Sequence, residues 1–178
     1  CFILFHLNYK KIILIIIIMK KIEIIKKTQK RAILDKLDLS ANSYDVKAQC
    51  EMINKLYLHN TFPEERKIKS QINTKLNSYK KQDKLKSRFD ENKFITTDET
   101  VELLVASKMQ CHYCKCSMLI FYTNVREPRQ WTLDRINNDI GHYGDNVVIS
   151  CLDCNLKRRR TNKDSFLFTK QLKLVKKN

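Results

Sequence analysis

The sequence predicts an α+β fold, in which a helical region is followed by a small cysteine-bearing domain of strands and helices. Three observations lead to this prediction. Apolar residues recur at helical spacing through the lysine-rich first half, three strand-like runs lie in the second half, and two C-x-x-C pairs flank those runs. We expect the helical region over residues 19–95 and the cysteine-bearing domain over residues 96–178.

The helical region carries two apolar stripes. The first runs over residues 46–57, after an expected N-cap at Asn42 or Ser43. Residues 61–64 (Thr-Phe-Pro-Glu) match a capping box with proline early in the first turn, which predicts a second helix start. The stripe of that second helix comprises Ile68, Ile72, Leu76 and Tyr79. This half of the chain alone indicates no function.

The second half alternates between helical and strand-like patterns. Residues 96–99 form a capping box that begins another helix. Residues 118–122, 131–136 and 147–149 are strand-like. Residues 137–145 hold both glycines of the chain, so we expect unusual backbone angles there. A helix is expected to begin at the second cysteine pair and to continue through Arg160, and an amphipathic segment follows it.

The first eighteen residues are mostly isoleucine and other apolar residues. Lys10 and Lys11 split this stretch, so neither part reaches the roughly 20 apolar residues of a spanning helix. No small-residue cleavage site follows, and the first methionine is Met19. We expect residues 1–18 to be a leader outside the native protein, with a short membrane anchor as the alternative. Without them we expect a cytoplasmic or nuclear protein that has no membrane partner.

The net charge of +16 favours a polyanionic partner. A surface rich in Lys and Arg attracts nucleic acid, and the release of counterions from phosphates drives the binding. The alternative is a solvated basic surface that reflects a biased composition. Charge and its distribution together favour nucleic acid as the partner.

The two C-x-x-C pairs predict a zinc site. Cys111, Cys114, Cys151 and Cys154 supply the four thiolates of a closed tetrahedral site. The gap between the pairs is wider than in ordinary zinc ribbons, so a hairpin or loop must lie between them. A domain this small gains stability from such a metal. We interpret His112 and Cys116 as bystanders, and four free or buried thiols are the alternative to a metal site.

The order of motifs over residues 108–162 resembles a zinc-containing HNH (ββα-metal) endonuclease, as found in phages and large DNA viruses. The residues that carry the resemblance are Cys111-x-x-Cys114, Leu133-Asp134-Arg135-Ile136, Gly141-His142, Asn146, and Cys151-x-x-Cys154-Asn155 with Lys157. The resemblance implies a β-hairpin followed by a helix. It also implies that Asp134 and Asn155 hold a catalytic Mg²⁺ or Mn²⁺, separate from the structural zinc.

The sequence departs from that family at the position after Asp134. The family has a general-base histidine there, whereas this chain has Arg135, which stays protonated and suits phosphate binding instead. His142 is the replacement base that we consider, and a metal-bound hydroxide is the other. The alternative for His142 is a local hydrogen bond, and for Asp134 a salt bridge to Arg135 or to a neighbouring strand.

These observations favour metal-dependent hydrolysis of phosphodiester bonds in DNA. Lys157, Arg158, Arg159 and Arg160 are expected to help Arg135 to position the phosphate backbone. The rival interpretation is a zinc-stabilised nucleic-acid-binding protein that has lost cleavage. A zinc domain that only binds proteins fits the charge poorly. The sequence does not distinguish DNA from RNA, or duplex from branched substrates.

Overall fold

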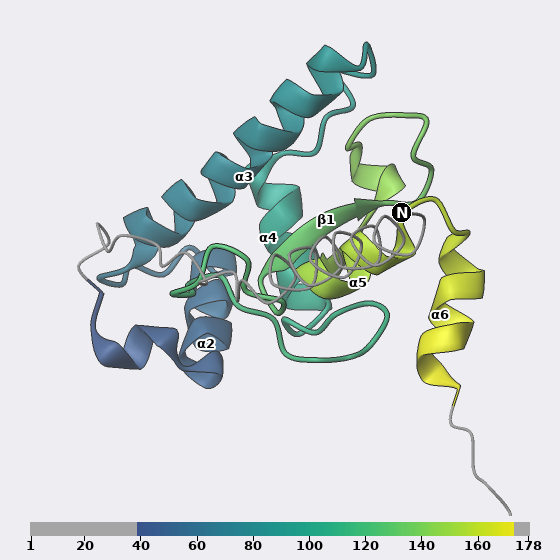
Figure 1. Ribbon diagram of the computed structural model, residues 1–178. Coiled ribbons are helices and arrows are strands. Elements are labelled where there is room, and N and C mark those ends of the chain that lie inside the picture. The colour runs from purple at the N-terminus through teal and green to yellow at the C-terminus, as the bar shows by residue number, and fades with distance from the viewer. Residues whose placement is uncertain (1–38, 173–178) are drawn as a thin grey trace, which may run out of the picture. The chain divides into compact units, whose positions relative to one another are not determined.

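The computed structural model describes residues 39–172, which lie within one compact unit. The leader expected at residues 1–18 falls outside the described residues. The elements are η1 (Ala41–Tyr44), α2 (Val46–Tyr57), α3 (Glu65–Leu85), α4 (Thr97–Ala106), β1 (Trp131–Arg135), η2 (Gly144–Asn146), β2 (Val147–Cys151), α5 (Leu152–Arg158) and α6 (Lys163–Gln171). Helices come first and a two-stranded sheet with its following helix comes later, which confirms the α+β prediction (Figure 1).

The starts of the first two long helices differ from the predictions. Asp45, rather than Asn42 or Ser43, caps α2, because its extended backbone aims the carboxylate at the amides of Lys47 and Ala48. The capping box predicted at residues 61–64 does not form. The N-cap of α3 is Glu64, whose backbone angles (φ −90°, ψ 1°) are not extended, and no side chain caps this helix.

The helices before residue 96 share one hydrophobic core with the rest of the described chain. Helix α4 packs against both α2 and α3. Its predicted capping box is confirmed: the Glu99 amide donates to the Thr96 hydroxyl at 3.2 Å, and the Glu99 carboxylate accepts from the Thr96 amide at 2.7 Å. The predicted stripe of α3 is also confirmed, since Ile68, Ile72 and Leu76 are buried. The stripe therefore faces the same core as Trp131 of β1.

Strands β1 and β2 form an antiparallel hairpin that leads directly into α5. Their register pairs Trp131 with Cys151 and Arg135 with Val147. Helix α5 packs against both strands and lies alongside β1 in Figure 1. The predicted strand at residues 118–122 is wrong, because this buried segment makes only single bridges such as Leu119 with Gln130. Its amides at Ile120 and Phe121 donate to the side chain of Gln49 instead of to a strand.

The glycine-bearing loop between the strands has ordinary backbone angles at both glycines, so the expectation of unusual angles was wrong. Gly141 is required by close approach instead, because a Cβ there would lie 2.5 Å from the carbonyl oxygen of Arg88. Asn146 closes this loop. Its side chain accepts from the Asn137 amide and donates to the carbonyls of Asn137 and Gly141, each at 2.9 Å.

Helix α5 is shorter than predicted. It ends at Arg158, because Arg159 takes a left-handed conformation with φ 51°. The basic run therefore leaves the helix after its second residue. The amphipathic segment that follows forms α6, with Phe166 buried and Phe168 exposed. Within the described residues, no helix is long and apolar enough to cross a membrane.

Candidate metal centre and its surroundings

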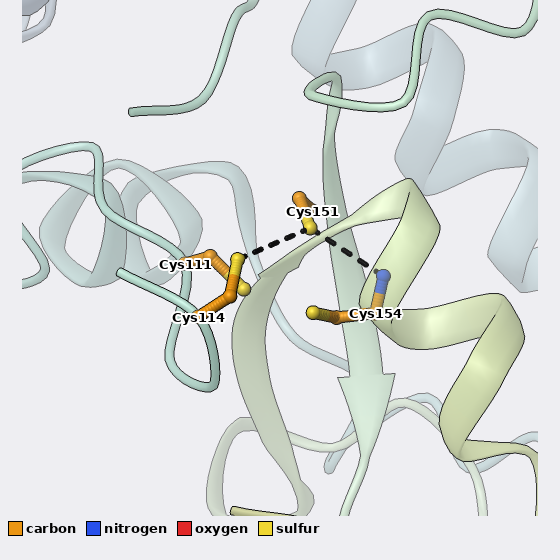
Figure 2. Close-up of side chains that lie close together, drawn as sticks. All are labelled: Cys111, Cys114, Cys151 and Cys154. Atoms are coloured by element: carbon orange, nitrogen blue, oxygen red, sulfur yellow. Dashed lines mark hydrogen bonds between the residues drawn. The ribbon is translucent and has the colours of Figure 1, made fainter. Parts of the chain in front are cut away.

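Four cysteine side chains converge where the hairpin meets α5. Cys111 and Cys114 come from the turn after α4, Cys151 ends β2 and serves as the N-cap of α5, and Cys154 lies in the first turn of that helix. Figure 2 shows the four sulfur atoms facing one another, and all four lie within 4.8 Å of one another. The structure thus brings together the cysteines that the sequence singled out.

The local backbone supports this cluster. The Cys154 amide donates to the Cys151 sulfur at 3.4 Å, and the sulfurs of Cys114 and Cys151 are 3.8 Å apart (Figure 2). Lys115 directly follows the first pair with φ 59°, a left-handed conformation that reverses the chain at this turn. Such conformations cost a non-glycine residue free energy, so the turn is held by the contacts around it.

Sulfurs within the cluster shift one another's pKa values. A hydrogen bond with Cys151 lowers the pKa of Cys111 to about 4, and the same bond raises the pKa of Cys151. Burial raises the pKa of Cys154 to about 12. Four close sulfurs cannot all be thiolates without a compensating charge, which a divalent ion supplies. Four thiols in this arrangement fit a structural zinc ion.

Two neighbours of the cluster stay outside the group of four, as the sequence predicted. Cys116 is half-buried, and its backbone carbonyl accepts from the Cys111 amide at 2.9 Å. His112 turns its ring toward Tyr113 in an edge-on contact, with ring centroids 5.0 Å apart. Neither residue belongs to the group of four sulfur ligands.

Asp134 lies in the interior and is fully engaged by protein groups. Its carboxylate oxygens accept from the guanidinium of Arg158, at 2.6 Å from Nε and 2.8 Å from a terminal nitrogen. The Tyr113 hydroxyl donates to Oδ2 at 2.6 Å. Only 3% of Asp134 is exposed. Its salt-bridge partner is thus Arg158 of α5, and neither Arg135 nor a strand residue.

Asn155, the other residue expected to hold a catalytic ion, lies half-buried against β1. Its side-chain amide donates to the Thr132 hydroxyl at 3.0 Å and to the Leu133 carbonyl at 3.2 Å. The structure therefore brings Asn155 next to the strand segment that carries Asp134. The contacts of its amide fix α5 on the hairpin.

His142 is buried and bound to Asp83 of α3. The Asp83 carboxylate accepts from the His142 backbone amide at 2.7 Å and contacts ring atom Nδ1 at 2.9 Å. Tyr79 stacks on the imidazole with ring centroids 4.5 Å apart. Burial lowers the pKa of His142, and the bond to Asp83 only partly offsets this effect. His142 is thus held by a long-range bond to Asp83, 59 residues earlier on α3, and not by a hydrogen bond local to its loop.

Arg135 is largely buried, with 13% of its side chain exposed. Its guanidinium donates to the Ile140 carbonyl at 3.2 Å and lies 3.6 Å from an Asp83 carboxylate oxygen. Burial lowers the pKa of Arg135, and Asp83 opposes that shift. One acidic residue of α3 thus anchors both Arg135 and His142.

The four consecutive cations at residues 157–160, which were predicted to contact phosphates together with Arg135, differ in exposure. Lys157, Arg159 and Arg160 are exposed, whereas Arg158 is 1% exposed and is held by Asp134. Lys157 forms an ion pair with Asp153 within α5. Arg160 contacts Asp139 of the glycine-bearing loop at 2.7 Å. Three of these cations are therefore accessible to solvent, and the fourth belongs to the interior.

Three residues at this site were missed by the sequence reasoning. Asp83 lies four residues after Tyr79 and so continues the apolar stripe of α3. An acidic residue on an apolar helix face indicates a buried carboxylate, and this pattern could have identified Asp83. Tyr113 stands inside the first C-x-x-C pair and carried no signal of its contact with Asp134. Lys75 of α3 binds the side chain of Gln130 and the carbonyl of Trp131.

Trp131 lies in the core beside Lys75. Trp131 is fully buried, and the Lys75 ammonium lies 4.9 Å from the centroid of its ring. A platform for nucleic-acid bases must be accessible, so this tryptophan is a core residue. Burial lowers the pKa of Lys75 to about 7.

Comparison with known proteins shows a similarity to a viral protein. The chain is 35% identical over 74 residues to an uncharacterized protein of Acanthamoeba polyphaga mimivirus. The match covers 42% of this chain and 12% of the viral protein, so the chain spans a small part of that relative. No protein-family model matches the chain, and no solved structure matches it either.

Proposed function

We propose that this protein binds nucleic acid, with DNA as the first candidate, through an HNH-like ββα module that a structural zinc ion stabilises. The observation that carries the proposal is the basic segment at the end of α5. Lys157, Arg159 and Arg160 are exposed there, in a chain with a net charge of +16. Exposed cations beside a helix end contact phosphates without reading sequence.

The order of elements supports the same proposal. A β-hairpin leads into a helix, and a cysteine cluster joins the two at their junction. This is the arrangement that the resemblance to HNH proteins implies, in the same order of motifs. The similarity to a viral protein is compatible with it but assigns no function, because that relative is uncharacterized.

Binding is tested by fluorescence anisotropy with labelled duplex DNA, single-stranded DNA and RNA over a range of salt concentrations. We expect Arg160→Ala to weaken binding to every sequence and to reduce the slope of log affinity against log salt by about 1. Lys55→Ala is the matched control, since Lys55 is an exposed cation on α2. Equal effects of the two variants would show that net charge, and not this segment, drives the binding.

A second candidate function is metal-dependent cleavage of phosphodiester bonds in DNA. The observation that favours it is the position of Asn155, whose amide binds the carbonyl of the residue preceding Asp134. The two residues expected to hold Mg²⁺ or Mn²⁺ therefore share one corner of the hairpin. They do not fit that ion in this structure, because Asp134 is buried against Arg158 and Tyr113. Binding without cleavage is thus the better-supported proposal.

Cleavage is tested by incubating supercoiled plasmid with the purified protein, with and without Mg²⁺ or Mn²⁺. Metal-dependent nicking that Asp134→Ala abolishes, while the zinc content stays unchanged, would establish the second candidate. Arg135→His restores the residue of the resembling family and is the informative companion variant. Tight binding with no nicking in either protein is the result that we expect.

A further inference from the structure

The carboxylate of Asp134 has a cation bound to it already. Two guanidinium nitrogens of Arg158 contact its two oxygens in a bidentate arrangement, at 2.6 and 2.8 Å. Such pairs are the strongest and most directional that arginine forms. Two further donors of Arg158 bind the carbonyls of Arg135 and Thr161. The guanidinium is thus enclosed by acceptors from β1 and from the segment after α5.

A divalent ion at Asp134 would have to displace this guanidinium. Arginine remains protonated in proteins, and Arg158 is 1% exposed, so displacement would leave a buried positive charge without its partner. Burial by itself lowers the pKa of Arg158, but the bonds to Asp134 outweigh it and raise the pKa overall. The bidentate contacts and the burial of both groups therefore favour the closed pair over an open carboxylate.

The cysteine cluster reinforces the pair from the other side. Tyr113, which donates to Asp134 at 2.6 Å, stands between the two cysteines of the first C-x-x-C pair. Phe166 of α6 packs edge-on against the Tyr113 ring, with centroids 4.9 Å apart. The metal-binding turn and α6 thus hold the hydroxyl in place against the carboxylate.

We propose that Arg158 acts as an internal cation that replaces a catalytic metal ion at Asp134, so that the module excludes divalent ions there and binds nucleic acid without cleaving it. The last clause rests on the proposed function, whereas the exclusion of ions does not. A salt bridge that merely stabilises the fold would behave differently, because its removal would create no metal site.

The test is a titration of the full-length, zinc-loaded protein with Mn²⁺, followed by electron paramagnetic resonance and calorimetry. We compare the wild type, Asp134→Asn, Arg158→Met, and the double variant Asp134→Asn/Arg158→Met. The wild type and Asp134→Asn should bind Mn²⁺ equally weakly. Arg158→Met should gain one site that is at least about tenfold tighter, and the double variant should lose it.

Two outcomes would overturn the inference. One is a Mn²⁺ site in the wild type that Asp134→Asn removes. The other is a folded Arg158→Met variant with wild-type affinity for Mn²⁺. If Arg158→Met does not fold, the comparison of the wild type with Asp134→Asn decides the question, since equal affinities support exclusion and unequal affinities contradict it.

The anisotropy assay separates this inference from the proposed function. If the protein fails to bind nucleic acid but shows the expected pattern of Mn²⁺ binding, the proposed function is refuted and the internal-cation inference is supported. If the protein binds DNA and also binds Mn²⁺ through Asp134, the proposed function is supported and the internal-cation inference is refuted.

Discussion

The two ends of α5 carry two groups of potential metal ligands, and they differ in one respect. At the first turn, Cys154 faces three other sulfurs, and Lys157, which interacts with Cys151 and Cys154, is exposed and paired with Asp153. At the last turn, Arg158 provides the cation for Asp134 from within the chain. The first group therefore offers four sulfurs to a metal ion from solution, while the second is already neutralised. Residues with ligand atoms do not by themselves define a metal site. A cationic side chain that is already paired with those ligand atoms prevents a metal ion from binding to them.

Removal of the metal from the cysteine cluster should have the largest effect. Structural zinc contributes roughly 10–16 kcal/mol in small domains, as much as the whole stability of many proteins. We expect Cys154→Ser, or a chelator, to abolish cooperative thermal unfolding as followed by circular dichroism. Cys50→Ser is the control, because Cys50 lies on α2 outside the cluster. A zinc-free protein with an unchanged melting transition would contradict the metal centre.

Breaking the Asp134–Arg158 pair should come next. Removing one partner leaves an uncompensated buried charge, which costs about 3–5 kcal/mol. We expect Arg158→Met to lower the free energy of unfolding by this amount in urea denaturation. The double variant Asp134→Leu/Arg158→Met should recover much of the loss, because neither charge remains. If the loss of stability in the double variant equalled the sum of the losses in the two single variants, the two residues would act independently.

Substitution of Asp83 should have a smaller effect. Asp83→Asn keeps the shape but removes the charge that holds His142 and Arg135, and we expect a loss of roughly 1–3 kcal/mol. Hydrogen exchange should rise in the glycine-bearing loop and not in α5. Glu102→Gln, an exposed position on α4, is the control and should change neither quantity. Exchange that rises equally in both segments would argue against a local anchor.

The smallest effect concerns pH. The pKa of His142 is lowered from 6.5 in the folded state, so the unfolded chain binds more protons just below that pH. The contribution of His142 to stability is complete above 6.5 and declines as the pH falls below it. The slope stays under about 1.4 kcal/mol per pH unit. We expect the free energy of unfolding of His142→Gln, measured by urea denaturation, to depend less steeply on pH between about pH 5 and 7. This interval surrounds the ordinary histidine pKa of about 6.5.

Much of the candidate site was predictable where local spacing defines it. Each C-x-x-C pair brings two sulfurs to one turn regardless of the rest of the chain, so the ligand group was readable from the sequence. The capping box at Thr96 and the two strands of the hairpin were likewise local signals, and the structure confirms them. The strand predicted at residues 118–122 failed because Gln49, seventy-one residues before Ile120, takes the hydrogen bonds of that segment.

The sequence by itself determined the four sulfur ligands, the hairpin followed by a helix, and the excess of positive charge, because spacing and composition encode these features. Tertiary structure alone decided the partners of the charged residues. Arg158 stood in a run of four cations that looked alike, and only the packing of α5 against β1 turned it inward toward Asp134. Asp83 contacts His142 only because the fold brings α3 against the glycine-bearing loop. A buried charge must find its counter-charge wherever the fold places one, and that place is not written in local sequence.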